Sequence, residues 1–318
     1  MEAEDVKYCN QLHEIKGKLQ SIALSDASVR EYLDRAVSEN TKKAYRADIE
    51  HFRRWGGNIP CGSDVLAAYI SAYAGVLACA TITRKIAAVS KAHTMQGYPS
   101  PARNDLIRMT MKGVRRVHGR PQAQVNALTK EDIIVVLNKI PDDLRGCRDR
   151  AAILLGFSAA LRRSELCRVK VEDLNFTSEG LILTLPRSKT DQCGEGRQIG
   201  VPLGRSKICP VQSLKQWLEK SGIAEGYVFR GIDKGVVVEA PLCDKSIANI
   251  IKSRAKQAGL DPAQYSGHSL RSGLASSAAQ HGFSSWEIRR VTGHKSDSQL
   301  QKYIRIGSLF QNNASALF

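Results

Sequence analysis

A histidine and a tyrosine lie nine residues apart in the stretch GHKSDSQLQKYIRIG, residues 293–307, near the end of the chain. A tyrosine ring can pack in a core, or its hydroxyl can attack an electrophile once the proton has left. An imidazole, which titrates near neutral pH, can donate a hydrogen bond or move a proton. His294 and Tyr303 therefore indicate either two packed rings or part of a nucleophilic site.

Three other stretches carry polar side chains where helical periodicity does not need them. The segment AALRRSEL places Arg162 and Glu165 directly after an apolar helix. The segment RSKTDQ places Lys189 at the tip of an expected β-hairpin. In SGHSLRSG, His268 and Arg271 are three residues apart at an expected helix start, so their side chains point the same way.

Each stretch alone has a simpler structural interpretation, because arginines near helix ends, lysines in turns and histidines at helix starts are common. Together, their order and spacing are specific. They resemble the tyrosine site-specific recombinases, or phage integrase family, and among them the Cre-like simple recombinases. The shared pattern is L-R-x-S-E-L, a hairpin lysine, H-x-x-R, G-H and a tyrosine nine residues later. The resemblance covers residues 128–318 and is weaker over residues 20–120.

The resemblance implies one active site built from all four stretches. Its catalytic residues would be Arg162, Glu165, Lys189, His268, Arg271, His294 and Tyr303. Tyr303 would be the nucleophile, and Glu165 the acidic residue that steadies the site. Family members carry histidine or tryptophan at the His294 position, so the chemistry stays the same there. Arg163 and His281 match no functional position of the family.

Phosphodiester transfer suits these residue types. A five-coordinate phosphorane concentrates charge on its non-bridging oxygens, which the forked guanidiniums of Arg162 and Arg271 can bind. His268 and His294 can add hydrogen bonds or shuttle a proton, and Lys189 can protonate the departing sugar oxygen. A phosphotyrosine link would conserve the energy of the broken bond. We therefore expect no cofactor, no metal and no ATP.

Helices are expected in the first third of the chain, where apolar residues recur at three- and four-residue spacing. The expected helices span residues 25–37, 38–56, 61–78 and 80–97. They predict a helical core DNA-binding domain over residues 21–117, behind an N-terminal extension of residues 1–20. Tyr45, Phe52 and Trp55 are expected in the core of this domain.

A second domain is expected after a basic linker at residues 118–127, where Gly119 and Pro121 interrupt the helical pattern. Thr129 and Asp132 predict a capping box. Helices follow at residues 130–140 and 144–160, then a hairpin with a long turn at residues 181–203. The remainder is expected to be helical, with a C-terminal tail from about residue 306. The fold class is mainly α with a small antiparallel β-sheet: a helical domain plus an α+β tyrosine-recombinase catalytic domain, residues 128–318.

The charge of the chain predicts a polyanionic partner, because 47 Lys and Arg residues face 31 Asp and Glu residues, for a net charge of +16. Residues 81–120 hold nine basic residues and one acid. We expect DNA contacts from Lys42, Lys43, Arg46, Arg84, Lys85, Lys91, Arg115, Arg116 and Arg120. The simpler alternative is a basic enzyme whose charges are merely solvated.

The eight cysteines are scattered without zinc-ligand spacing, and the N-terminus has no signal-peptide pattern. No run approaches the roughly 20 apolar residues that span a bilayer. These features predict a cytoplasmic protein without a membrane partner. The resemblance implies double-stranded DNA with an inverted-repeat target site as the partner, bound by a homotetramer on paired sites through a Holliday junction. The apolar tail, with Leu309, Phe310, Leu317 and Phe318, would dock on a neighbouring subunit as the resemblance implies, or pack on its own domain.

Two alternatives stay open. A type IB topoisomerase or a telomere resolvase would use related chemistry without exchanging strands between two sites. A non-catalytic DNA-binding protein could use the same scaffold, although the complete residue set disfavours it. The short N-terminal extension favours a simple recombinase over an integrase with a separate arm-binding domain.

Overall fold

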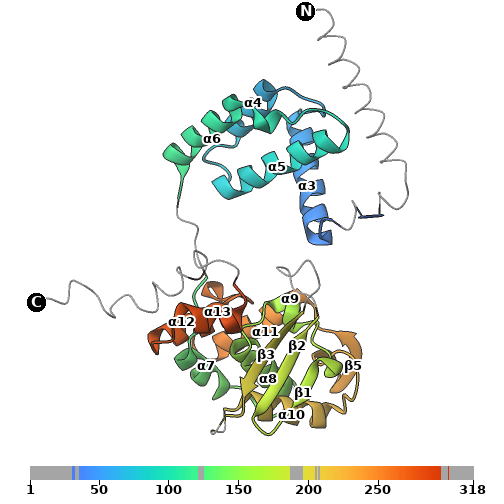
Figure 1. Ribbon diagram of the computed structural model, residues 1–318, viewed down its shortest axis with the longest axis vertical. Helices are drawn as coiled ribbons and strands as arrows, with labels where there is room; N and C mark the ends of the chain where they lie inside the picture. The colour runs from blue at the N-terminus through green and yellow to red at the C-terminus, as the bar shows by residue number, and fades with distance from the viewer. Residues whose placement is uncertain are drawn as a thin grey trace, which may run out of the picture. The chain divides into compact units, whose positions relative to one another are not determined.

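The computed structural model describes residues 31–32, 36–120, 125–186, 196–204, 206, 208–294 and 300. The chain divides into two compact units, Met1–Gln122 and Ala123–Phe318 (Figure 1). This division falls inside the expected linker at residues 118–127. Lys189, Tyr303 and the C-terminal tail lie outside the described residues.

Helices form the N-terminal unit between residues 36 and 120. They are α3 (Glu39–Trp55), α4 (Ser63–Ala72), α5 (Cys79–Met95), the 3-10 turn η1 (Pro101–Arg103) and α6 (Asp105–His118). Their apolar faces meet in one core around Phe52, Leu66, Tyr69 and Val89, all at most 1% exposed. The expected helix at residues 25–37 falls almost wholly outside the described residues.

The helix expected at residues 61–78 is shorter than predicted, because α4 ends at Ala72. The Tyr73 amide donates to the Ile70 carbonyl in a tight final turn. Gly75 then takes a φ of +79°, a left-handed conformation that glycine adopts without steric cost and that ends the helical path. The apolar residues of 73–78 thus pack as a loop, which periodicity alone does not distinguish from a helix.

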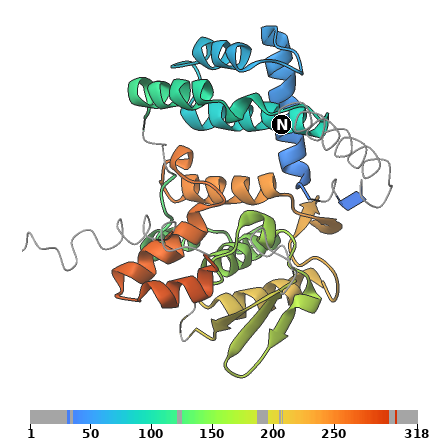
Figure 2. The ribbon, with the colours of Figure 1, turned by 45° about the horizontal axis from the view of Figure 1, so that its top comes forward.

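The C-terminal unit combines helices with two small sheets (Figure 2). Its helices are α7 (Lys130–Leu137), α8 (Leu144–Ser158), α9 (Arg163–Leu166), α10 (Pro210–Ser221), α11 (Asp244–Gln257), α12 (Ser269–Gln280) and α13 (Ser285–Thr292), with 3-10 turns η2 (Val171–Asp173) and η3 (Pro262–Gln264). Thr129 and Asp132 form the predicted capping box at the start of α7. None of the helices in the described ranges has the length and apolar content that crossing a bilayer demands.

The first sheet contains the expected hairpin. Strands β1 (Leu174–Phe176), β2 (Gly180–Leu185) and β3 (Arg197–Pro202) pair antiparallel in that order. Leu183 lies opposite Ile199, and both are buried, whereas their neighbours along the strands are more exposed. This two-residue alternation turns one face of the sheet toward the core that α8 and α10 share.

A second hairpin contradicts the expectation that the chain is helical after residue 209. Strands β4 (Arg230–Asp233) and β5 (Val236–Pro241) pair antiparallel around Lys234 and Gly235. Both turn residues have positive φ, 44° and 85°, as a type I′ hairpin turn requires. The run of three valines that begins at Val236 was the sequence signal for this strand.

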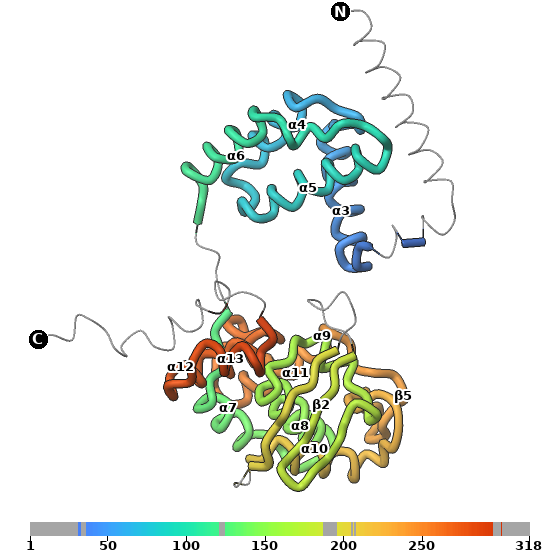
Figure 3. Tube along the Cα trace, in the orientation of Figure 1, coloured from blue at the N-terminus to red at the C-terminus, as the bar shows by residue number. Residues whose placement is uncertain are grey.

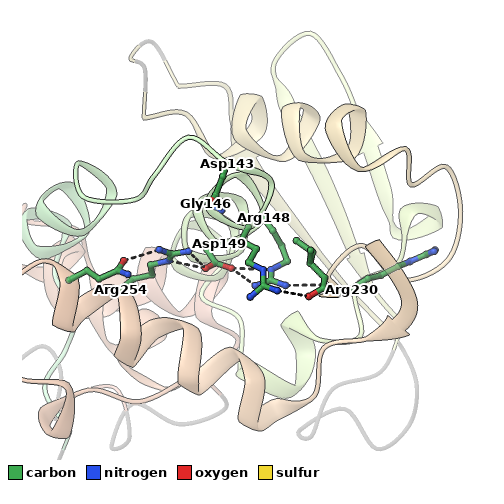
Figure 4. A network of polar contacts seen from close by, with 9 residues as sticks. Asp143, Gly146, Arg148, Asp149, Arg230 and Arg254 are labelled. Atoms are coloured by element: carbon green, nitrogen blue, oxygen red, sulfur yellow. Dashed lines mark hydrogen bonds and ion pairs between the residues drawn. The ribbon is translucent and has the colours of Figure 1, made fainter. Parts of the chain in front are cut away.

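Buried charges fix α8 against its neighbours (Figure 4). Asp149, on α8, accepts hydrogen bonds from Arg148 at 2.8 and 3.0 Å and from Arg254 of α11 at 2.8 Å. Arg148 also donates to the Arg230 carbonyl of β4 at 3.3 Å. Because each charge is buried and paired, moving α8 would leave an uncompensated charge in the core. These contacts fix the N-terminal half of α8, the helix whose C-terminal end leads to the first candidate motif.

Candidate active site

Arg162 and Glu165 lie where α8 ends and the short helix α9 begins. Arg162 is the N-cap residue of α9, and its amide donates to Glu165 Oε2 at 2.9 Å. Its guanidinium Nη1 donates to Glu165 Oε1 at 2.5 Å. The Glu165 side chain is 5% exposed and that of Arg162 is 21% exposed. The buried carboxylate therefore holds both the backbone and the side chain of a partly accessible arginine.

Arg271 reaches the same place from α12. It lies in the first turn of that helix, is 1% exposed, and donates from Nη1 to the Ala160 carbonyl at 2.8 Å. Ala160 has a φ of 50°, in the left-handed region, so the chain leaves the helical path of α8 at this residue. One hydrogen bond thus joins the H-x-x-R segment to the residue two before Arg162.

His268 precedes α12 by one residue and lies near both arginines. Burial lowers the pKa of His268 below its ordinary value, and the positive charges of Arg271 and Arg162 lower that pKa further. The residue still keeps an exposed part. A neutral imidazole with a solvent-facing edge beside two guanidiniums can hydrogen-bond to an anion that binds there.

His294 follows α13 and is oriented by Thr292, two residues earlier. The buried Thr292 hydroxyl donates to the Ile288 carbonyl at 2.8 Å, and His294 Nδ1 lies 2.8 Å from the same hydroxyl oxygen. Because a hydroxyl has one hydrogen, the His294 contact requires Nδ1 to be the donor. Neutral His294 therefore carries its hydrogen on Nδ1, and Nε2 is its acceptor atom.

Five of the seven expected catalytic residues lie close enough to influence one another's charge. Burial, followed by the charges of Arg271, Arg162, His268 and Arg197, lowers the pKa of His294 to about 4. The structure thus brings together Arg162, Glu165, His268, Arg271 and His294. Among the described residues no group of His, Cys, Asp or Glu could hold a metal ion.

Arg197 belongs to this cluster and was missed by the sequence analysis. Burial lowers its pKa, an effect that Glu165 opposes and Arg162 reinforces. Its Nη1 donates to the Val291 carbonyl at 3.1 Å. The available signal was its position at the start of β3, the strand that follows Lys189 in the sequence.

The expected DNA-binding residues of the N-terminal unit fall into two groups. Exposed residues on α3, α5 and α6, and directly after α6, are Lys43, Arg46, Arg84, Lys91, Arg115, Arg116 and Arg120. Lys42 is half-buried and pairs with Glu39 at 2.8 Å. These residues therefore leave a largely accessible basic surface on the three helices.

Lys85 is the exception, because it lies inside the N-terminal unit rather than on its surface. Its side chain is 7% exposed, and Nζ lies 3.1 Å from Oδ1 of the buried Asp48. Arg84 donates to the same carboxylate at 2.8 and 3.0 Å. Because Lys85 is buried and pairs with Asp48, it is not placed to contact a DNA phosphate directly, as the sequence analysis expected.

Comparison with known proteins assigns the family. The profile of the phage integrase family matches residues 126–308, more than half of the chain. The chain belongs to the phage integrase family, the tyrosine recombinases. All five described catalytic candidates lie within the matched range.

Two curated relatives and one solved structure illustrate the similarity. An integrase/recombinase XerD homolog from Selenomonas ruminantium is 36% identical over 293 residues, which cover 89% of this chain and 86% of the relative. Recombinase Cre from Escherichia phage P1 is 24% identical over 249 residues, covering 72% and 71%. A lambda integrase tetramer bound to a Holliday junction matches with a TM-score of 0.59 at 19% identity, covering 85% of this chain and 76% of that chain. Cre-like therefore describes this tyrosine recombinase only loosely.

Proposed function

We propose that this tyrosine recombinase exchanges DNA strands between two target sites, with Tyr303 as the nucleophile. In each cleavage the Tyr303 oxygen forms a bond to the scissile phosphorus, and the 5′ oxygen of the next nucleotide leaves. The resulting 3′-phosphotyrosine is attacked by a 5′ hydroxyl of the second site, which releases the tyrosine. A first pair of such exchanges forms a Holliday junction and a second pair resolves it, without an external energy source.

The observation that carries this proposal is that two arginines, each held in place by a hydrogen bond, lie beside two neutral histidines. Arg162 is held by Glu165, and Arg271 by the Ala160 carbonyl. Preorganised cations stabilise a phosphorane without reorganising at the moment of reaction. Arg162 and Arg271 would bind the non-bridging oxygens, while Glu165 acts on the reaction through the position of Arg162.

Proton transfer completes the proposed reaction. His294 is neutral near pH 7 because its pKa is about 4, and Nε2 is its acceptor atom. We assign to His294 the uptake of the Tyr303 proton and to His268 a hydrogen bond to the phosphate. Lys189 would protonate the 5′ oxygen as it leaves. The tyrosine proton would return when the phosphotyrosine is resolved.

The proposed assembly is a homotetramer on two inverted-repeat DNA sites, bound through the basic surface of the N-terminal unit. The lambda integrase tetramer on a Holliday junction supports this assembly by analogy of fold. The exposed side chains of Lys43, Arg46 and Arg116 support contact with phosphates. The reaction would take place in the cytoplasm, where the DNA substrate of a bacterial or phage recombinase is found.

A strand-exchange assay tests the proposed function. Two DNA fragments of different length, each carrying the inverted repeats found beside the gene in its source genome, are incubated with the protein without ATP. We expect products that join the left arm of one fragment to the right arm of the other. Relaxation of a supercoiled plasmid or hairpin ends without such joints would instead indicate topoisomerase or resolvase activity.

A further inference from the structure

Arg197 lies at a junction of three parts of the catalytic unit. It is the first residue of β3 and pairs with Leu185, the last residue of β2, at the base of the hairpin that carries Lys189. Its guanidinium crosses to the end of α13, where Nη1 donates to the Val291 carbonyl. The hairpin base, Arg197 and the segment that leads into His294 are therefore mechanically connected.

Gly293 shows how closely Arg197 approaches that segment. A Cβ atom built on Gly293 would lie 2.1 Å from Arg197 Nη1, and Gly293 has a φ of +65°. The left-handed backbone favours glycine at this position, and any larger residue would displace the Arg197 guanidinium. The guanidinium thus lies directly against the backbone that positions the His294 ring.

Two donor atoms of this guanidinium are buried without an acceptor. Nε and Nη2 of Arg197 have no hydrogen-bond partner in the part of the chain that the structure describes, and neither atom is accessible to solvent. Buried donors of a charged group are costly when unpaired and are nearly always satisfied in proteins. Nε and Nη2 form one edge of the guanidinium, the edge that can bind two oxygens of an oxyanion side by side.

The neighbouring carboxylate does not satisfy this edge. Both Glu165 oxygens already accept hydrogen bonds from Arg162, and no hydrogen bond joins Glu165 to Arg197 among the described contacts. The edge is therefore suited to an anion that arrives from outside the described residues.

We propose that Arg197 is a third arginine of the active site and donates Nε and Nη2 to the scissile phosphate of bound DNA. This inference rests on the proposed function, since it names another group that would bind the same phosphate. The Val291 hydrogen bond holds Nη1, and the atoms that cover Nε and Nη2 in the free protein would move aside for the phosphate. Arg197 would share with Arg162 and Arg271 the charge that develops on the non-bridging oxygens.

The test compares two substrates in single-turnover cleavage with saturating protein. One has the ordinary phosphodiester, and the other has a methylphosphonate at the scissile position, which lacks one charged oxygen. Arg197→Met keeps the length of the side chain and removes every donor. Arg163→Met is the matched control, because Arg163 is 51% exposed and contacts only Asp244, at 3.8 Å, among the ion pairs of the described residues.

We expect Arg197→Met to slow cleavage of the phosphodiester by about 10²-fold, the usual effect of losing one preorganised donor set. On the methylphosphonate the same substitution should change the rate only a few-fold, because the charge that Arg197 binds is gone. Arg163→Met should match wild type on both substrates. An equal loss on both substrates, or no loss on either, would overturn the proposal; an equal loss would leave Arg197 with a positioning role on the His294 segment.

Arg197→Lys keeps the assay decisive if the methionine variant fails to fold, as judged by thermal unfolding. Lysine retains the charge but cannot form the fork. The cleavage rate of Arg197→Lys should therefore again fall more on the phosphodiester than on the methylphosphonate. Equal rates of Arg197→Lys and wild type on the phosphodiester would contradict binding through Nε and Nη2. Failure of wild type to form any covalent adduct would refute the proposed function itself, which is a separate outcome.

Discussion

Glu165 accepts two hydrogen bonds from one residue, the backbone amide of Arg162 at 2.9 Å and its guanidinium at 2.5 Å. The first bond caps helix α9 and fixes the main chain of Arg162. The second fixes the direction of the side chain. Helix initiation and arginine orientation therefore depend on the same buried carboxylate.

Glu165→Gln should slow phosphotyrosine formation by roughly 10-fold while DNA binding is kept, because the amide retains the shape but loses the charge that orients Arg162. Single-turnover cleavage and gel mobility measure the two effects. Asp173→Asn is a matched control, because Asp173 caps η2 by accepting from the Lys170 amide at 2.9 Å and is only half-buried. Equal loss in both variants would mean that capping, and not arginine orientation, is what matters.

The pKa of His294 predicts how stability changes with pH. In the folded protein this pKa is about 4, below the ordinary value of 6.5. Between those values the unfolded chain binds more protons, so the free energy of unfolding should fall as the pH drops from 6.5 toward 4. Because solvent screens this half-buried ring, the contribution is less than the full shift implies, on the order of 1–3 kcal/mol.

Urea unfolding across this pH range measures the effect, and His294→Gln should have a shallower pH dependence than wild type. Direct NMR titration of the ring should give a midpoint well below 6.5. The account would be contradicted by an NMR midpoint for His294 at or above 6.5, together with an equal pH dependence of the unfolding free energy in His294→Gln. His294 would then not be neutral, as its assigned role as a proton acceptor requires.

Arg116 and Lys85 should respond differently to salt. Arg116→Ala removes an exposed cation, so the slope of log affinity against log salt concentration should become shallower by about 1. Lys85→Met should leave the slope unchanged and instead lower the free energy of unfolding by about 3 kcal/mol, since Asp48 loses part of its compensation. A reduced salt slope in Lys85→Met would return this lysine to the DNA-binding surface.

Lys189→Ala should reduce cleavage by roughly 10² to 10⁴, the range for a lost general acid. A substrate with bridging sulfur at the 5′ position should restore its rate, because a thiolate leaves without protonation. The same sulfur should not rescue Arg162→Ala or Arg271→Ala, in which the phosphorane charge stays unbalanced. Rescue of all three variants, or of none, would remove the general-acid role from Lys189.

Local sequence patterns predicted the features that depend on neighbouring residues. The Thr129 and Asp132 capping box and the antiparallel pairing of β2 with β3 were both predicted, since caps and strand alternation act over a few residues. The β4–β5 hairpin was missed because its valines were read as part of a helical region, although Lys234 and Gly235 supply the turn.

Long-range contacts account for the other differences. Lys85 was expected on the surface, but its partner Asp48 lies 37 residues earlier in the chain. Arg197 was not selected, because its contact with Val291, 94 residues away, exists only in the folded C-terminal unit that contains both β3 and α13 (Figure 3). Charge and spacing in a sequence do not encode which cation becomes buried.

Covalent trapping is the most direct test of the proposed reaction. Wild-type protein is incubated with EDTA and a target site nicked close to the scissile phosphate, so that the short fragment carrying the released 5′ hydroxyl diffuses away after cleavage. Adducts are separated by denaturing electrophoresis and mapped by mass spectrometry. We predict a 3′-phosphotyrosine on Tyr303, and no adduct with Tyr303→Phe, which should still bind the site. An adduct on another residue, or cleavage by Tyr303→Phe, would contradict the mechanism; Tyr265, which is 7% exposed and whose pKa is raised by burial, is not built to replace it.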